Sequence, residues 1–275
     1  MKKAIVKKKP AGLKKTGGKP AKAGKPKKSG FDPEVKVCPD AGNLFEEAAH
    51  LFMETALEAV RKRGRFVIAL SGGSTPKSLF QQLSETPYNS LVPWAKTYVF
   101  WVDERHVSLN DEASNYRLAR EQLLSKVPLP KDHVFPMLLR SSVQEASNLY
   151  ERGLKHFFGS KGLPRFDFTL LGMGEDGHTA SLFPGTPQLN ELEKWVVGYY
   201  VDETRKERIS LTFPVLNASR LAVVLLEGNK KAHRLKDVLE GSANPPRYPI
   251  QYLRPTEGRL LFMMDPSAAS QLKSK

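Results

Sequence analysis

Cysteine is almost absent from this 275-residue sequence, in which Cys38 is the only one. A single thiol can form neither an internal disulfide nor a cysteine-based zinc site, so we expect a reducing, intracellular environment. Long apolar runs are also missing, and the longest, residues 221–226, has the length of a strand. The Lys-rich N-terminus is not followed by the apolar segment of a secretory signal. We therefore expect a cytoplasmic protein with no membrane partner.

Metal-binding patterns are missing as well. The six histidines show neither H-x-x-x-H nor H-x-H spacing, and no cysteine is near them. A structural zinc site needs four such ligands at short, regular spacing. The sequence therefore predicts no metal site.

Acidic residues are absent from the first thirty residues, which hold twelve lysines. Residues 31–275 hold the other 31 basic side chains against 29 acidic ones, so most of the net charge of +14 belongs to the N-terminal segment. We predict that residues 1–30 form a disordered tail, because Lys, Pro, Gly and Ala offer little apolar surface to bury. The tail could contact polyanions non-specifically or act only as a solubilising extension.

The remaining residues, 31–275, alternate between strand-like and helix-like periodicity. This alternation predicts a single α/β domain with an open, mostly parallel sheet flanked by helices. Asn43, with Glu46 three residues later, is the expected N-cap of the first helix. Strands are expected at residues 65–70, 97–102, 166–171, 195–201, 209–213, 221–226 and 260–263, and further helices at 76–83, 115–124, 143–158 and 230–239.

In sheets of this kind, ligands bind beyond the carboxyl ends of the strands. A Gly-rich turn follows the strand at 65–70 and precedes a helix, where free backbone N–H groups and hydroxyls can hold a phosphate. The alternative is a tight turn with no ligand, and the turn lacks the lysine of a P-loop. Its residues are Ser71, Gly72, Gly73, Ser74 and Thr75, followed by Pro76.

A charged cluster, Asp103-Glu104-Arg105-His106, follows the strand at 97–102. Such charges are costly to hold in a crevice without partners. Arg105 can neutralise an anionic substrate or a developing oxyanion, whereas we expect His106 to belong to an exposed, salt-bridging loop.

A Gly-rich segment with one histidine, residues 172–185, follows the strand at 166–171. Asp176, two residues before His178, can fix the tautomer of the imidazole and leave its other nitrogen as a base for water. A purely structural histidine is the alternative. A nucleophilic serine at Ser71, Ser74 or Ser181 is a further alternative, although none lies in a G-x-S-x-G elbow.

Four segments together resemble the 6-phosphogluconolactonase family, in the superfamily that also holds glucosamine-6-phosphate deaminase. They are SGGSTP (71–76), VDERHV (102–107) with SNYR (114–117), GMGEDGHTASLFPG (172–185) and RISLTFPVLNAS (208–219). The likeness runs from about Val35 to Met264, in the family's order, and leaves out the Lys-rich tail.

The resemblance implies a Rossmann-like fold, no metal and no nucleotide cofactor. It also implies hydrolysis of 6-phospho-D-glucono-1,5-lactone to 6-phosphogluconate in the oxidative pentose phosphate pathway. His178 would then be the general base and Asp176 its orienting acid, with Arg105 near the carbonyl or the phosphate. Ser71, Gly72, Gly73, Ser74 and Thr75, with Arg208, would hold the 6-phosphate.

Two other functions have to be compared with the lactonase. The deaminase branch carries a glutamate five residues after the histidine, where this sequence has Phe183, so deamination is disfavoured. A non-catalytic sugar-phosphate-binding protein would have no use for an aimed base. One departure from the family leaves the phosphate ligand open between Arg205, Lys206 and Arg208, because the usual Lys and prolines before Arg208 are missing.

Overall fold

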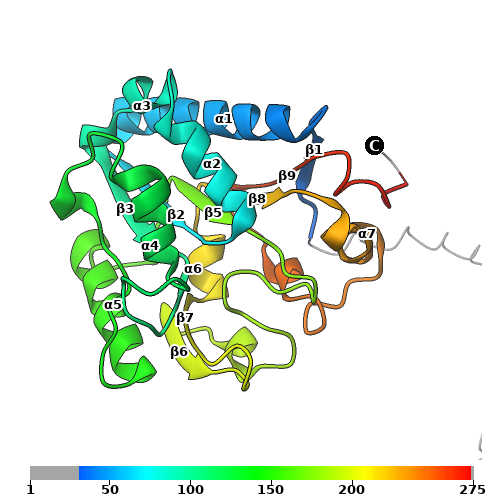
Figure 1. The fold of residues 1–275 in the computed structure, drawn as a ribbon. Coiled ribbons are helices and arrows are strands. Elements are labelled where there is room, and N and C mark those ends of the chain that lie inside the picture. Colours follow the sequence, from blue (N-terminus) through cyan, green and yellow to red (C-terminus); the bar gives the residue numbers. More distant parts are fainter. Residues whose placement is uncertain (1–30, 274–275) are drawn as a thin grey trace, which may run out of the picture.

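The computed structural model describes residues 31–273 and contains two β-sheets (Figure 1). The larger sheet has six strands in the order β1-β9-β8-β5-β2-β3, and every adjacent pair is parallel. This arrangement confirms the predicted α/β fold with an open parallel sheet. Its strands are β1 (Glu34–Val37), β2 (Phe66–Leu70), β3 (Thr97–Trp101), β5 (Phe168–Leu171), β8 (Leu221–Leu226) and β9 (Arg259–Met264).

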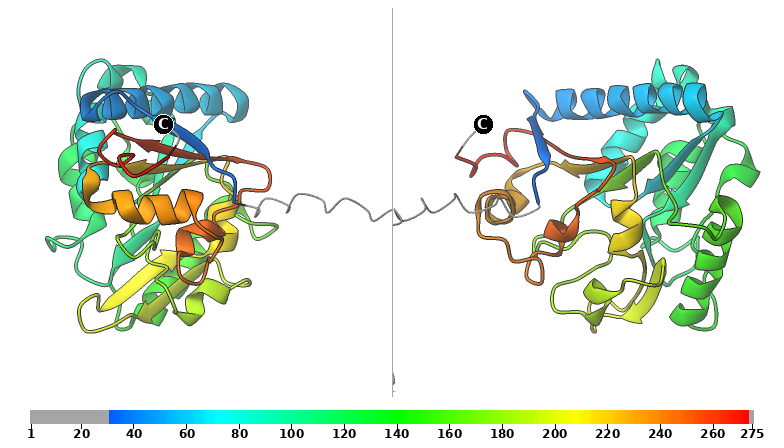
Figure 2. Two further views of the ribbon diagram at one scale, coloured as in Figure 1. Left: turned by 90° about the vertical axis from the view of Figure 1, so that its right-hand side faces the viewer. Right: turned by 180° about the vertical axis from the view of Figure 1, so that it is seen from behind.

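Helices cover both faces of this sheet. In the side view of Figure 2, strands β8 and β9 run between α1 and α7. Short 3-10 turns add to the connections at residues 94–96, 131–133, 187–190, 229–231 and 249–252. The helices are α1 (Ala41–Arg63), α2 (Ser74–Ser84), α3 (Tyr88–Leu91), α4 (Asn115–Ala119), α5 (Val143–Phe158), α6 (Phe213–Asn217) and α7 (Ala232–Glu240), and a π-helical turn over Arg120–Leu124 continues α4.

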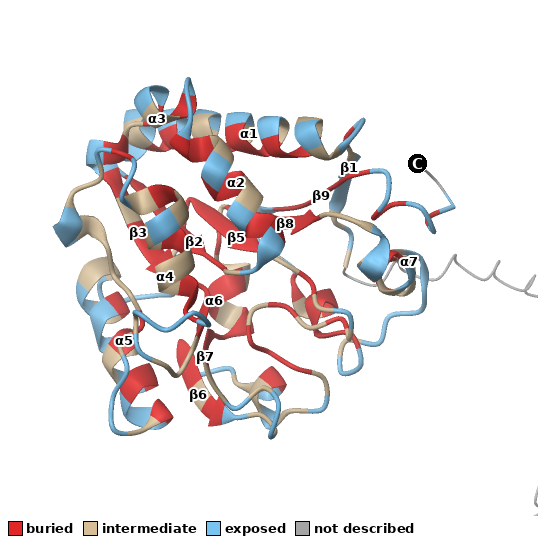
Figure 3. Cartoon of the chain, viewed as in Figure 1, coloured by how far each residue is buried: buried red, intermediate tan, exposed pale blue. Residues whose placement is uncertain are grey.

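The central strands β2, β5 and β8 are buried along their whole length (Figure 3). Burial on both faces explains why their sequences are continuous apolar runs rather than alternating ones. From α1, Phe52 packs edge-on against Phe66 of β2 and Phe168 of β5, with ring centroids 5.1 and 5.2 Å apart. These aromatic contacts tie the longest helix to the two strands whose ends carry the Gly-rich segments.

The first helix begins three residues earlier than the sequence indicated. Its N-cap is Asp40, whose carboxylate accepts a hydrogen bond of 2.8 Å from the backbone N–H of Asn43. The expectation that Asn43 is the cap is therefore wrong, because an equally good capping side chain stands three residues ahead of it. Strand β1 was not predicted either. It has only four residues, which are mostly exposed at the edge of the sheet, so its sequence is not a continuous apolar run.

The smaller sheet is antiparallel and has the order β4-β7-β6. Its strands are β4 (Asp103–Arg105), β6 (Val196–Tyr200) and β7 (Glu207–Leu211). The charged cluster after β3, expected to be a loop, is thus mostly a strand, in which Arg105 lies opposite Arg208. Three charged residues carry no strand-like periodicity, and their extended conformation depends on pairing with β7.

Tyr150 of α5 fixes the point where β3 passes into β4. Strand β3 is the edge of the large sheet, and the Tyr150 hydroxyl accepts a hydrogen bond from the backbone N–H of Trp101 (2.7 Å) and donates one to its carbonyl (3.1 Å). Burial raises the pKa of Tyr150, so the phenol stays protonated and can do both. The start of β4 is thereby held in place.

The Lys-rich segment 1–30 lies outside the described residues, so its predicted disorder and polyanion contacts stay predictions. Within residues 31–273, no helix is long and apolar enough to cross a membrane.

Candidate active site

The three polar clusters meet at one cavity of about 330 Å³, beyond the carboxyl ends of β2, β3 and β5. The Gly-rich turn after β2 contributes Ser71 to Pro76, and β4 contributes Asp103 and Arg105. His178 comes from the segment after β5, and Lys231 from the segment after β8. The rule that ligands bind at these strand ends therefore locates the cavity correctly.

The Gly-rich turn leads directly into α2, whose first turn starts at Ser74 with Gly73 as its N-cap. Gly73 has φ +112°, a conformation that side-chain-bearing residues rarely adopt. The first backbone N–H groups of a helix have no partner within the helix, which makes this end suited to an anion. Ser71 adds a buried hydroxyl that lines the cavity and has no hydrogen-bond partner among residues 31–273.

Gly72 allows the turn to touch Asn115 of α4. A Cβ at position 72 would lie 1.9 Å from the Asn115 side-chain oxygen, so only glycine fits here. Asn115 also donates to the backbone carbonyl of Asp103 (2.9 Å) and accepts from Arg105 Nη1 (2.8 Å). One amide therefore links the Gly-rich turn to the cation of β4.

Glu104 has a structural task. Its buried carboxylate accepts hydrogen bonds from the backbone N–H groups of Arg105, Asn115 and Tyr116 at 2.8–2.9 Å. It also accepts one from the hydroxyl of Ser114 at 3.0 Å. Burial raises its pKa, against the effect of these backbone hydrogen bonds. The bonds attach the start of α4 to β4 and so set the position of Arg105.

His106 does not line the cavity. Its Nδ1 lies 2.7 Å from Glu207 Oε2, which agrees with the expected ion-paired role. The expectation of exposure is wrong, however, because only 7% of the side chain is accessible. Besides Glu207, the backbone N–H of Arg140 contacts the imidazole, donating to Nε2 at 3.5 Å.

His178 and Asp176 form a close pair at the wall of the cavity. The imidazole Nδ1 lies 2.5 Å from Asp176 Oδ1, and the backbone N–H of His178 donates to the same oxygen at 3.1 Å. Burial opposes ionisation of Asp176, but the hydrogen bonds and charge of His178, with Arg205, outweigh it and lower the pKa of Asp176 to about 2. An ionised Asp176 requires a proton on Nδ1, which leaves Nε2 as the basic nitrogen.

The ring of His178 packs directly on Gly174. A Cβ at position 174 would lie 2.1 Å from the imidazole, so the glycine makes the room for the ring. On its other side, the ring of Phe183 has its centroid 4.4 Å from that of the imidazole. Within residues 31–273, no serine hydroxyl is hydrogen-bonded to His178, and Ser181 instead donates to Asp103 at 2.7 Å.

The three candidate phosphate ligands before and in β7 differ in their surroundings. Arg205 binds Asp176 (2.9 Å) and Asp202 (3.0 Å), whereas Lys206 binds the exposed Glu203 (3.0 Å). Arg208 makes no ion pair within residues 31–273, and burial, followed by the charge of Arg105, lowers its pKa. None of the three lines the cavity. Arg208 lies opposite Arg105 in the β4–β7 pair, and Arg105 is the residue that lines the cavity.

Lys231 is a cation that the sequence analysis missed. It lines the cavity, and burial lowers its pKa, with Glu175 and Glu227 opposing that shift. The same rule that found the other clusters would have found it, because Lys230 and Lys231 follow the strand β8 within five residues.

Comparisons with known proteins identify the family of the chain. Residues 39–262 match the family model described as glucosamine-6-phosphate isomerases/6-phosphogluconolactonase. The chain belongs to this family. A relative in Arabidopsis thaliana, the chloroplastic 6-phosphogluconolactonase 3, is 39% identical over 84% of this chain and 72% of its own length. The 6-phosphogluconolactonase of Synechocystis sp. is 36% identical over 88% of this chain and 99% of its own.

A solved structure of this family has the same fold. The 6-phosphogluconolactonase from Trypanosoma cruzi superposes with a TM-score of 0.78 at 28% identity, over 88% of this chain and 98% of its own. All four segments that carried the resemblance lie within the part that matches the glucosamine-6-phosphate isomerase/6-phosphogluconolactonase family, and residues 1–30 lie outside it.

Proposed function

We propose that this protein hydrolyses 6-phospho-D-glucono-1,5-lactone to 6-phosphogluconate, the second step of the oxidative pentose phosphate pathway. The observation that carries the proposal is that one cavity holds a carboxylate-oriented imidazole, His178, and the N-terminal turn of α2 with the residues before it, Ser71 to Thr75, where backbone N–H groups can receive an anion. A phosphorylated lactone needs both groups at once: a base for water and a cradle for phosphate.

The phosphate end of the substrate would lie against the start of α2. The cavity is lined there by Ser71, Gly72, Gly73, Ser74 and Thr75. The buried Ser71 hydroxyl, which has no partner within residues 31–273, can donate a hydrogen bond to the phosphate. Arg105 and Lys231 supply positive charge on the same cavity wall. Arg208, opposite Arg105 in the β4–β7 pair, adds to the positive field and is the candidate for direct contact from β7.

The reaction would proceed through a water activated by His178. As the water oxygen attacks the lactone carbonyl carbon, His178 Nε2 takes its proton, and the ionised Asp176 stabilises the imidazolium. A cation of the cavity wall, Arg105, can stabilise the charge that develops on the carbonyl oxygen. The bond between the carbonyl carbon and the ring oxygen then breaks, and the imidazolium returns the proton to that oxygen.

Two alternative functions fit the cavity less well. Glucosamine-6-phosphate deaminase chemistry needs a second proton carrier after the histidine, and the apolar ring of Phe183 packs on the imidazole at that position in the sequence. A non-catalytic sugar-phosphate-binding protein would not require an imidazole held in one tautomer by a carboxylate.

A coupled lactonase assay tests the proposal, with spontaneous lactone hydrolysis subtracted. We expect turnover of the phosphorylated lactone and none of glucosamine 6-phosphate. Turnover of glucosamine 6-phosphate instead would support the deaminase alternative. Saturable binding of both compounds without turnover would support the binding protein.

A further inference from the structure

We propose that Arg205 is a positioning residue for His178, because its guanidinium contacts both groups that hold the imidazole. The inference rests on the proposed function, since it assigns Arg205 to the base of that reaction. Arg205 lies in the loop between β6 and β7, 27 residues beyond His178 in the sequence.

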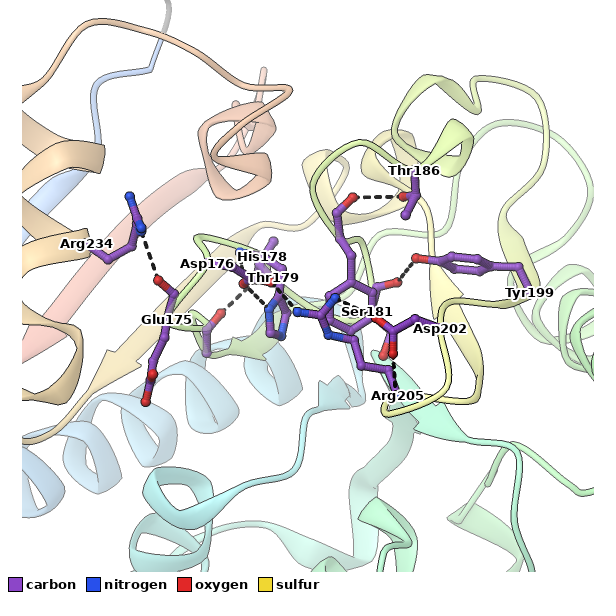
Figure 4. Close-up of polar contacts among 12 residues, drawn as sticks. Glu175, Asp176, His178, Thr179, Ser181, Thr186, Tyr199, Asp202, Arg205 and Arg234 are labelled. Carbon is purple, nitrogen blue, oxygen red and sulfur yellow. Dashed lines mark hydrogen bonds and ion pairs between the residues drawn. The ribbon is translucent and has the colours of Figure 1, made fainter.

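The first contact is with the orienting acid. The two carboxylate oxygens of Asp176 have different partners (Figure 4). Oδ1 accepts a hydrogen bond from His178 Nδ1 at 2.5 Å, and Oδ2 accepts one from Arg205 Nη2 at 2.9 Å. With both oxygens engaged, the carboxylate cannot rotate away from the imidazole without breaking a charge-assisted bond.

The second contact is with the ring behind the imidazole. The Arg205 guanidinium carbon lies 4.5 Å from the centroid of Phe183, within the range of a cation–π interaction. Phe183 in turn packs on His178 with a centroid separation of 4.4 Å. One guanidinium thus contacts both the carboxylate and the aromatic ring that touch the imidazole.

Arg205 is itself held by its loop. Asp202 accepts from Arg205 Nη1 at 3.0 Å and from the backbone N–H groups of Thr204 and Arg205 at 3.0 and 2.7 Å. The backbone of Lys206 closes the loop through hydrogen bonds with Asp202 and Val201. The β6–β7 loop therefore presents the guanidinium in one place, which a positioning role requires.

Arg205 is poorly placed to hold the substrate phosphate. It does not line the cavity, and its two terminal nitrogens bind carboxylates of Asp176 and Asp202. Loss of Arg205 should therefore lower kcat and leave KM nearly unchanged, whereas loss of a phosphate ligand should raise KM.

The test compares Arg205→Met with the matched control Lys206→Met. Both variants lose one positive charge from the same loop, but the Lys206 ammonium pairs with the exposed Glu203 and, among residues 31–273, with no group of the site. We expect Arg205→Met to lower kcat by about 10- to 100-fold with KM changed less than about twofold, because small misplacement of a catalytic group has effects of this size. Arg205→Lys, which keeps the charge without the planar fork, should fall between Arg205→Met and wild type. Lys206→Met should behave as wild type.

The pH dependence of kcat/KM provides a second measurement, which a general loss of stability in the variant would not shift. His178 shares its surroundings with Asp176 and Arg205, and the cavity wall adds Asp103, Arg105, Glu175 and Lys231. Only the Arg205 charge changes in Arg205→Met. Removing a nearby cation makes the imidazole easier to protonate, so the acidic limb of kcat/KM should move to higher pH.

An NMR measurement distinguishes failure of this inference from failure of the proposed function. In the absence of substrate, the Nδ1–H resonance that His178→Ala lacks should persist in Lys206→Met and broaden or disappear in Arg205→Met. If wild-type protein fails to hydrolyse the lactone, the proposed function fails, and the NMR result still decides whether Arg205 orders the imidazole. If Arg205→Met matches Lys206→Met in kcat, pH profile and spectrum, the positioning role is wrong. A rise in KM alone would also overturn it and make Arg205 a phosphate ligand.

Discussion

The six-stranded and three-stranded sheets contribute different kinds of groups to the cavity. The parallel sheet ends in Gly-rich segments, which supply a helix N-terminus at Ser74 and the room around His178. The antiparallel sheet supplies guanidinium groups: Arg105 at the cavity, Arg208 beside it and Arg205 on the loop that reaches Asp176. The parallel sheet thus contributes the base and the backbone geometry around it, and the antiparallel sheet contributes guanidinium charge.

The largest effect should come from the base, at the end of the parallel sheet. His178→Ala should reduce lactone turnover by about 10²–10⁴-fold, because a positioned general base contributes about that much. Steady-state kinetics with the spontaneous rate subtracted would measure it, alongside a melting curve to show that the variant is folded. Near-wild-type turnover in a folded variant would remove His178 from the mechanism.

A smaller loss is expected when only the room around the base is changed. In Gly174→Ala the new methyl group would lie 2.1 Å from the imidazole and must displace it, so we expect kcat to fall by about 10²-fold. Gly153→Ala in α5 is the control, because a Cβ there has nothing within 4 Å and the residue does not line the cavity. Equal activity of the two variants would show that the position of the ring is not critical.

Strands of both sheets could be predicted from the sequence, whereas the pairing that makes the antiparallel sheet could not. Strands β2, β3, β5 and β8 were found within two residues of their observed bounds, because strands buried on both faces are continuous apolar runs. The rule on strand ends then located Ser71 to Thr75, Arg105 and His178 at a common cavity.

Strands β6 and β7 were also predicted within two residues of their observed bounds, but their assembly with β4 into a separate antiparallel sheet was not predicted. Strand β4 has only three residues, all charged, and nothing in its periodicity indicates a strand. The contact of Arg205 with Asp176 spans 29 residues and depends on how the β6–β7 hairpin lies over the segment after β5. Such pairings follow from tertiary packing, which local pattern does not encode.

A third prediction measures the contribution of the antiparallel side. Arg208→Ala should weaken use of the phosphorylated lactone by about one to two decades, since a charged hydrogen bond contributes about 1.5–3 kcal/mol. The unphosphorylated lactone should be affected far less, and kcat/KM for both substrates would be compared. Equal losses on the two lactones would give Arg208 another role, and Lys231→Ala would be the next variant to measure.

The smallest effect on catalysis should come from the segment outside both sheets. Deleting residues 1–30 should leave kcat and KM unchanged, because the matched family segment, 39–262, and every residue of the cavity lie beyond it. The deletion removes twelve lysines and leaves 31 basic against 29 acidic side chains. Non-specific binding of DNA or RNA should therefore fall sharply, because few counterions would be displaced by the remaining chain.

A salt titration of nucleic-acid binding on both chains checks this prediction. The full chain should bind less tightly as salt rises, with a slope set by the number of phosphate contacts, and the truncated chain should show little binding to titrate. Since Lys, Pro, Gly and Ala bury little apolar surface, the two melting curves should coincide. Loss of activity on truncation would show that residues 1–30 contribute to the cavity. Undiminished DNA binding would show that residues 31–275, despite their near-neutral charge, present a basic face of their own.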